Sequence, residues 1–114
     1  MPRDPRLYLD DIMEAISLVR EYTHEMSFPQ FSTDRKTQDA VIRNLEVIGE
    51  ASARLPEALR AKEPGMDWRK MVGMRNILAH AYFGVSITIV WDAVQTKLQP
   101  LEQACIRLLQ HLDE

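Results

Sequence analysis

Apolar residues recur at three- and four-residue intervals along most of the chain, which is the period of an α-helix. The first such run follows Asp4, a residue type suited to an N-cap, and begins with Pro5, which suits the first helical position. Its apolar face comprises Leu9, Ile12, Ile16, Val19 and Met26. We therefore expect a first helix over about residues 5–25.

The segment "SFPQFSTD", residues 27–34, interrupts this period, and a second helix is expected behind a cap supplied by Ser32, Thr33 or Asp34. The apolar face of this second helix comprises Val41, Leu45, Ile48 and Leu55. Gly49 lies within it and costs about 1 kcal/mol relative to alanine. A glycine at that position indicates close packing against another helix.

A third long helix is expected to begin at Trp68, capped by Asp67, after a proline-interrupted stretch with room for one short helical turn around Leu59. Gly84 is a natural stop for this helix. Its apolar face carries Met71, Met74, Ile77, Leu78 and Ala81.

The segment "GVSITIVW", residues 84–91, is rich in β-branched side chains and by propensity could form a strand. A longer window favours a helix capped by Ser86, since the helical period continues through Ile87, Trp91, Val94, Leu98, Leu101, Cys105, Leu108 and Leu112. Pro100 interrupts this pattern, so we expect a kink or a break there. The chain is therefore predicted to be one all-α domain, residues 1–114, folded as an antiparallel bundle of four to five helices.

The composition narrows the classes of protein that this domain can belong to. With 46% apolar residues in 114, one compact core is expected, but a deep cleft is not, so a site shared between subunits is plausible on size alone. No apolar run approaches the ~20 residues that span a bilayer. A lone cysteine and the lack of a secretory signal pattern at the start predict a reduced, cytoplasmic protein with no membrane partner.

The charge is unevenly distributed. The net charge of −3 argues against a general nucleic-acid binder, yet residues 51–80 hold six Lys/Arg against three Asp/Glu, whereas residues 1–50 hold six against ten. The basic middle could meet phosphate, although a solvated surface is the commoner explanation of such a segment.

The stretch "MRNILAHAYFG" places Arg75, Asn76, His80 and Tyr82 on the third predicted helix. At about 100° per residue, Arg75 and His80 lie about 140° apart and flank the face opposite the apolar one. Asn76 and Ala79 lie between them and form a shallow floor. A second copy of this helix across a two-fold axis would wall that floor and bring two arginines and two histidines together.

These residue types suit cleavage of RNA without a metal. Histidine can take the proton from a ribose 2′-hydroxyl or return one to the leaving 5′-oxygen, while arginine stabilises the negative charge of the transition state. Asn76 could orient the imidazole of His80 or bind the phosphate. Exposed Arg and His are more often ordinary surface residues, and stacking of Tyr82 on Arg75 would also be ordinary, so the residue types alone leave the question open. No pair of Asp, Glu, His or Cys has metal-ligand spacing.

Four stretches in order along the chain resemble the HepT-like toxins, a branch of the all-α HEPN ribonucleases. They are "YLDDIMEAI", "AVIRNLEVIGEAS", "DWRKMVGMRNILAHAYFGV" and "IVWDAVQTKLQPLEQ", and the third contains the Arg-x-x-x-x-His-x-Tyr signature of that family.

The resemblance implies a homodimeric, metal-independent endoribonuclease without a cofactor, acting as the toxin of a type VII-like toxin–antitoxin system. It implies that Arg75 and His80 are the catalytic pair, supported by Asn76. It also implies an MntA-type nucleotidyltransferase antitoxin that transfers AMP to Tyr82. The partner implied is RNA, either tRNA or mRNA. The acidic net charge argues against strong or sequence-independent RNA affinity and favours a small structured target, such as part of a tRNA, or a partner that supplies contacts.

Two rival hypotheses remain from the residues alone. In one, the protein is a non-catalytic binding or regulatory subunit of a nucleotidyltransferase, in which Arg75 and His80 contact nucleotide phosphate. In the other, it is a structural dimer whose interface is the helix that carries the motif. The intact Arg-Asn-x-x-x-His-x-Tyr string favours the enzyme.

Overall fold

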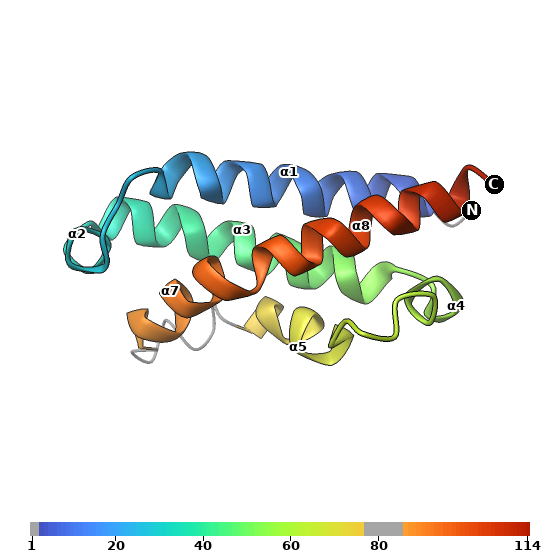
Figure 1. Ribbon diagram of the computed structural model, residues 1–114. Helices are drawn as coiled ribbons and strands as arrows, with labels where there is room; N and C mark the ends of the chain where they lie inside the picture. Colours follow the sequence, from blue (N-terminus) through green and yellow to red (C-terminus); the bar gives the residue numbers. More distant parts are fainter. Residues whose placement is uncertain (1–2, 77–85) are drawn as a thin grey trace.

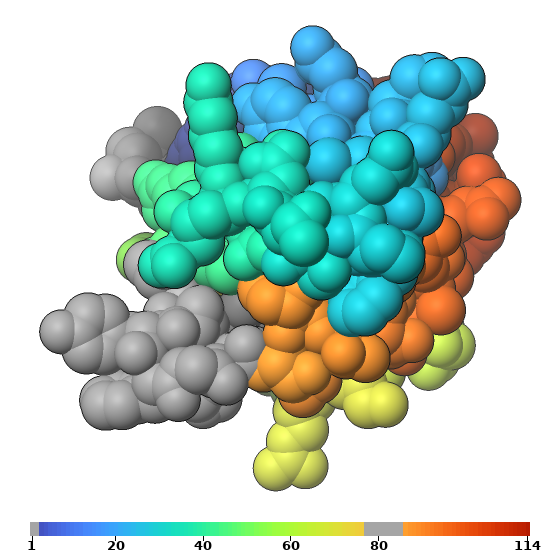
Figure 2. Space-filling model, turned by 90° about the vertical axis from the view of Figure 1, so that its left-hand side faces the viewer, coloured from blue at the N-terminus to red at the C-terminus, as the bar shows by residue number. Residues whose placement is uncertain are grey.

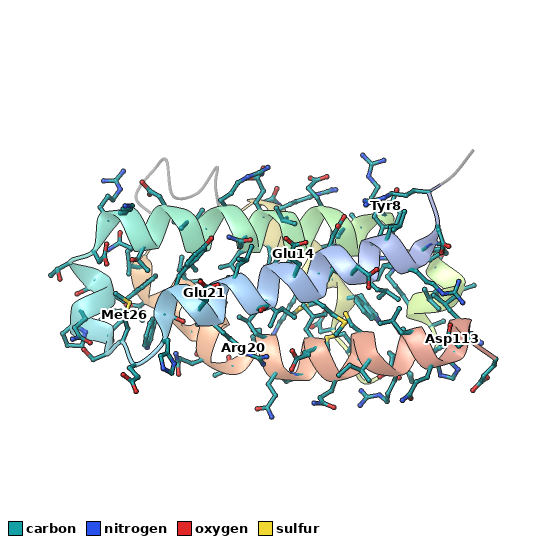
Figure 3. The ribbon with its side chains drawn as sticks, turned by 90° about the horizontal axis from the view of Figure 1, so that it is seen from above. Tyr8, Glu14, Arg20, Glu21, Met26 and Asp113 are labelled. Carbon is teal, nitrogen blue, oxygen red and sulfur yellow. The ribbon has the colours of Figure 1, made fainter. Side chains whose placement is uncertain are left out.

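The computed structural model describes residues 3–76 and 86–114, and the ordered elements in these two ranges are all helical. Three long helices form the body of the molecule: α1 (Pro5–Thr23), α3 (Arg35–Arg54) and α8 (Leu98–Leu112). They run side by side in Figure 1, and in the view from above α1 lies between α3 and α8 (Figure 3). The prediction of an all-α fold is confirmed.

Shorter elements cover one side and one end of these three helices. They are α2 (Phe28–Ser32), α4 (Glu57–Arg60), α5 (Trp68–Gly73), the 3-10 helix η1 (Met74–Asn76) and α7 (Ile87–Thr96). In Figure 1, α4, α5 and α7 lie along the side of the molecule opposite α1. The short turn expected around Leu59 is α4, and Leu59 is buried.

On α1 and α3 the core consists of the apolar faces that the helical period predicts. The residues Leu9, Ile12, Ile16, Val19, Val41, Leu45, Ile48 and Leu55 are all buried. On α7 the buried residues are instead Val90 and Ala93, and the predicted Ile87, Trp91 and Val94 are only partly buried.

Three predicted N-caps are confirmed, since the carboxylates of Asp4, Asp34 and Asp67 accept hydrogen bonds from backbone N–H groups in the first turns of α1, α3 and α5. The fourth, Ser86, occupies the N-cap position of α7 without a capping hydrogen bond from its side chain. Local sequence signals therefore define where these helices begin and which face they bury.

Helix α2 was not expected. Ser27 and Gln30 form a capping box, in which the Ser27 hydroxyl accepts from the Gln30 N–H and the Gln30 side chain accepts from the Ser27 N–H. Phe31 is fully buried, and its ring centroid lies 5.0 Å from that of Trp91 on α7. The segment that breaks the helical period therefore still contributes to the core.

The segment 84–91 could have been a strand by propensity, and its part from Ile87 onward is helical. The break expected at Pro100 falls three residues earlier, at Lys97, which ends α7 and precedes α8. The proline ring clashes with the carbonyl four residues before it, here that of Thr96, so one helix ends there. Pro100 then lies in the first turn of α8, where a missing N–H costs no helical hydrogen bond.

The third predicted helix differs from the structure. A continuous α-helix was expected from Trp68 towards Gly84, but the α-helix ends at Gly73 and continues as the 3-10 helix η1 to Asn76. Glycine has a low helix propensity, which favours a change of helix type at that point. Residues 77–85, and with them Ile77, Leu78 and Ala81, lie outside the described residues.

Ion pairs and hydrogen bonds connect α1 with α8 and with the residue that follows it. Arg20 on α1 donates to Glu102 on α8 at 2.8 Å, and it points towards α8 in Figure 3. Arg6 near the start of α1 donates to the carbonyl of Leu112 and to the carboxylate of Asp113. The two ends of the described chain are thereby held together. Within the described ranges, no helix is long and apolar enough to cross a membrane.

Candidate functional site

Two of the four motif residues lie in the described chain. Arg75 and Asn76 belong to η1, and both are exposed, as the sequence predicts for the side of this helix that faces away from the core. His80 and Tyr82 lie outside the described residues. The structure therefore places Arg75 and Asn76 next to each other on the surface. That His80 and Tyr82 lie close to them stays a prediction.

Helix α5 is anchored at its beginning by side-chain hydrogen bonds. The carboxylate of Asp67 accepts from the backbone N–H of Lys70 at 3.2 Å. The indole N–H of Trp68 donates to the carbonyl of Arg60 at 3.0 Å and to that of Glu63 at 3.3 Å. These bonds tie α5 to the turn after α4, and they satisfy the polar atom of Trp68, whose ring packs against the core.

The inner face of α5 and η1 is apolar. Met71 and Met74 are buried and belong to the same core cluster as the apolar face of α3. They fix the rotation of the segment, because turning it would expose both side chains to water. Arg75 follows directly after this buried pair.

Gly49 on α3 brings the backbone of Arg75 into direct contact with that helix. A Cβ added at residue 49 would overlap the backbone nitrogen of Arg75 and would lie 2.9 Å from its Cα and Cβ atoms. No residue with a side chain fits at that position without a shift of the backbone. The close helix packing that Gly49 predicted is thus a contact with the first motif residue.

The backbone of Arg75 packs against α3, while its side chain is exposed. Within the part of the chain that the structure describes, its guanidinium takes part in no ion pair or hydrogen bond. A guanidinium on a fixed backbone loses less freedom when it binds phosphate, and its planar fork matches two phosphate oxygens. The arrangement suits an anion-binding group.

The other cations of this region are also free of carboxylates. Six arginines elsewhere in the described chain form ion pairs with carboxylates: Arg3, Arg6, Arg20, Arg35, Arg43 and Arg107. Between residues 54 and 76, as far as the described residues show, the cations form none; they are Arg54, Arg60, Lys62, Arg69, Lys70 and Arg75. The local excess of positive charge seen in the sequence is therefore not neutralised within this segment.

One carboxylate of the same segment is neutralised from another helix. Arg107 on α8 binds Glu63 in a two-pronged arrangement, with Nε at 2.9 Å from Oε1 and 3.0 Å from Oε2, and Nη2 at 2.6 Å from Oε1. The hydrogen bonds that Arg107 donates hold the pKa of the Glu63 carboxyl below its ordinary value, and the same bonds, accepted by Glu63, raise the pKa of Arg107. Both groups stay charged at neutral pH, and the negative charge of Glu63 is offset locally.

The other titratable candidates have structural explanations. Cys105 is buried, and burial raises the pKa of its thiol to about 12, which suits a core residue and not a nucleophile. His24 is exposed beside Glu25, and His111 is half-buried near Glu114. Among the described residues, no group of three or more His, Cys, Asp or Glu is placed to hold a metal ion.

Sequence reasoning identified Arg75 and Asn76 but missed two supporting contacts. The pairing of Gly49 with Arg75 joins residues far apart in the chain, and the glycine inside an otherwise regular helix was its only signal. The ion pair of Glu63 with Arg107 has no signal in spacing, because 44 residues separate the two. Both contacts become visible only once α3, α5 and α8 are placed together.

Comparison with known proteins adds the family. The family model described as "Ribonuclease HepT-like" matches residues 12–108, a range that includes the whole motif. "Probable ribonuclease HepT" of Thermococcus cleftensis is 46% identical over 102 residues, which are 90% of this chain and 93% of that protein. A "Putative RNase" of Methanocaldococcus jannaschii is 46% identical over 99 residues, 86% of this chain and 82% of the relative.

Another M. jannaschii relative contains this domain as one part. It is named "Gamma-glutamylcyclotransferase and putative RNase" and is 37% identical over 114 residues, all of this chain but 51% of the relative. No solved structure matches the chain. The family match extends over most of the chain, and relatives more than 30% identical align with it along nearly their whole length. The chain therefore belongs to the HepT-like ribonuclease family.

Proposed function

We propose that this protein is a metal-independent endoribonuclease whose site combines the Arg75 and His80 of two subunits. The observation that carries the proposal is the unbroken Arg-Asn-x-x-x-His-x-Tyr string inside a match to a ribonuclease family. Arg75 supports it, because its guanidinium is exposed and pairs with no carboxylate among the described residues, while its backbone packs directly against α3.

The chemistry follows from the residue types. One imidazole removes the proton of a ribose 2′-hydroxyl, whose oxygen attacks the adjacent phosphorus. The bond from phosphorus to the 5′-oxygen breaks, and that oxygen takes a proton from an imidazolium. The products are a 2′,3′-cyclic phosphate and a 5′-hydroxyl. Arg75 stabilises the charge on the phosphate oxygens in the transition state, and Asn76, its exposed neighbour, binds the phosphate or orients the imidazole.

Two subunits are proposed because a single acid–base step needs both a proton acceptor and a proton donor. Each motif supplies one histidine, His80, so the two copies divide the roles. The small size of the chain supports this arrangement, since a cleft between two subunits makes up for the shallow surface of one. The substrate proposed for this cleft is a structured RNA such as a tRNA.

Control of the toxin is proposed to act at Tyr82. An MntA-type nucleotidyltransferase would transfer AMP from ATP to the phenolic oxygen, with pyrophosphate leaving. On a helical wheel Tyr82 falls within about 20° of Arg75, about two turns away. A phosphate attached there would bind the guanidinium of Arg75 and exclude RNA.

The proposed activity predicts cleavage of RNA in excess EDTA. The purified protein should cut total tRNA under these conditions and leave 2′,3′-cyclic phosphate and 5′-hydroxyl ends. It should not cut DNA of the same sequence, which lacks the attacking 2′-hydroxyl. End-group analysis by mass spectrometry measures both products. Loss of cleavage with EDTA and its return with a divalent cation would contradict the proposal.

The control at Tyr82 predicts a site-specific modification. Incubated with an MntA-type nucleotidyltransferase and ATP, the protein should gain one or more AMP units and lose RNA cleavage, whereas Tyr82→Phe should gain none and keep cleaving. Tyr22→Phe is the matched control, because Tyr22 is an exposed tyrosine on α1, a helix that does not carry the motif. Intact-mass spectrometry reads out the modification. Equal AMP transfer to the parent and to Tyr82→Phe would refute the assignment.

A further inference from the structure

Three exposed cations lie in the segment of the chain that precedes Arg75. Lys62 lies in the turn after α4, and Arg69 and Lys70 lie in the first turn of α5. We call these three residues the basic edge. In Figure 1 this part of the chain runs along the side of the molecule opposite α1, and in Figure 2 the yellow segment that contains α5 projects from the lower edge of the molecule.

The basic edge is positive within an acidic protein. Residues 54–76 carry six Lys/Arg and three Asp/Glu, a net charge of +3, in a chain whose net charge is −3. Of the three carboxylates, Glu63 is bound by Arg107, and Asp67 is occupied by the N–H of Lys70 as the cap of α5. Glu57 is the remaining one. An anion approaching this protein is therefore drawn to the side that carries α4 and α5.

Helix stability does not account for Arg69. A cation in the first turn of a helix opposes the helix dipole, at a cost of about 0.3–1 kcal/mol, whereas Lys70 also falls in the last turn of the six-residue α5. Helix α3 also begins with an arginine and a lysine, Arg35 and Lys36, but there Arg35 donates to Asp39 one turn later at 3.3 Å. In α5 the corresponding positions are Gly73 and Met74, which offer no carboxylate. Such uncompensated charges are typical of a functional surface.

The separation of Arg69 and Arg75 along the helix axis suits a nucleic-acid strand. Arg69 precedes Arg75 by six residues, a rise of about 9 Å along α5 and η1, which spans two to three nucleotides of a strand. We propose that the basic edge binds the phosphate backbone of the RNA strand that continues from the bond held by Arg75. This inference rests on the proposed ribonuclease function. RNA is favoured over an acidic protein surface because the segment ends at Arg75, the phosphate-binding residue of the proposed cleavage site.

The test is a pair of matched double variants. Arg69→Gln/Lys70→Gln removes two cations from the basic edge, and Arg35→Gln/Lys36→Gln removes the same two residue types from the first turn of α3. Both are made in the full-length His80→Ala protein, so that the RNA stays intact. Fluorescence anisotropy with a labelled single-stranded RNA of ten nucleotides measures Kd from 0.05 to 0.3 M KCl.

The α5 pair should weaken binding about 10- to 30-fold at 0.1 M salt and lower the slope of log K against log salt by about 1.4. The α3 pair should change neither quantity. Thermal unfolding should be unchanged or slightly raised in the α5 variant, since the dipole penalty is removed. Two results would overturn the inference. An equal loss of affinity in both variants would show that only the total charge matters, and no loss in either variant would show that the basic edge does not bind RNA.

The same variants separate this inference from the proposed function. In the His80-containing protein, Arg69→Gln/Lys70→Gln should raise KM for RNA with little change in kcat, because binding outside the reacting bond is lost equally in ground and transition states. Unchanged KM with normal cleavage would refute the basic edge and leave the ribonuclease intact. RNA binding that depends on Arg69 and Lys70, without cleavage by the parent, would refute the ribonuclease alone.

Discussion

His80→Ala is expected to reduce RNA cleavage by at least 10³-fold, because it removes both the proton acceptor and the proton donor of the proposed site. Arg75→Ala should reduce kcat by a similar factor through the loss of charge stabilisation in the transition state. Arg75→Lys should recover part of that loss, since lysine keeps the charge but lacks the two-pronged fork. Initial rates on a defined tRNA measure all three.

Two controls isolate the chemistry from folding and from charge. His24→Ala removes an exposed histidine at the end of α1, and Arg35→Ala removes an exposed arginine at the start of α3. Both should cleave RNA at the parent rate. A His80→Ala protein with parental activity would contradict the proposed role of His80, and equal losses in His80→Ala and His24→Ala would point to a general effect of removing histidine.

The proposed dimeric site also predicts how activity falls when His80→Ala subunits are mixed with parent subunits. If parent and His80→Ala subunits are mixed and allowed to exchange, a site that needs two histidines survives only in parent–parent dimers. Activity per total protein should then fall as the square of the parent fraction, whereas a site contained in one subunit gives a linear fall. An equal mixture of the two proteins distinguishes the cases: a quarter of the parental activity remains for a site shared by two subunits, and half remains for a site contained in one subunit.

Much of the fold follows from local patterns. Four aliphatic residues on α1, namely Leu9, Ile12, Ile16 and Val19, are buried as their spacing predicts, and the capping aspartates mark the starts of three helices. These features depend on residues within a few positions of one another. Helix α2 was missed because five residues are too few to show a period, although the Ser27 and Gln30 capping box was present in the sequence.

Long-range contacts were not predictable in the same way. The end of α5 at Gly73 and the change to η1 occur where the chain meets α3, and the ion pair of Glu63 with Arg107 connects α8 to the turn before α5. Within the motif, the exposure of Arg75 and Asn76 was predicted, while the placement of His80 and Tyr82 stays a prediction. The candidate site thus rests on local residues whose positions are set by distant ones.

Gly49→Ala is expected to lower both stability and cleavage, even though Gly49 makes no contact with RNA in the proposed mechanism. The added Cβ would overlap the Arg75 backbone nitrogen, so α3 and η1 must separate. Overpacking of this kind costs about 1–3 kcal/mol, against a gain of about 1 kcal/mol from replacing glycine in a helix. Chemical denaturation should show a net loss of up to about 2 kcal/mol.

The effect on cleavage should exceed the effect on folding. A backbone shift of about 1 Å at Arg75 carries its guanidinium away from the phosphate, and a misplacement of that size can cost about 10²-fold in rate. The loss should appear in kcat, measured at a temperature where both proteins are fully folded, because Arg75 acts on the transition state. A folded Gly49→Ala protein with parental kcat would show that this contact does not position Arg75.

Gly73→Ala is the matched control, because it makes the same substitution two residues before Arg75. A Cβ at residue 73 has no heavy atom of the described residues within 4 Å, and Gly73 closes α5, where alanine is the better helix former. This variant should gain about 0.5–1 kcal/mol of stability and keep the parental cleavage rate. A loss of stability in Gly49→Ala together with a gain in Gly73→Ala would show that the effect arises from the contact between α3 and Arg75. Equal losses would instead show that the segment needs glycine for its backbone freedom.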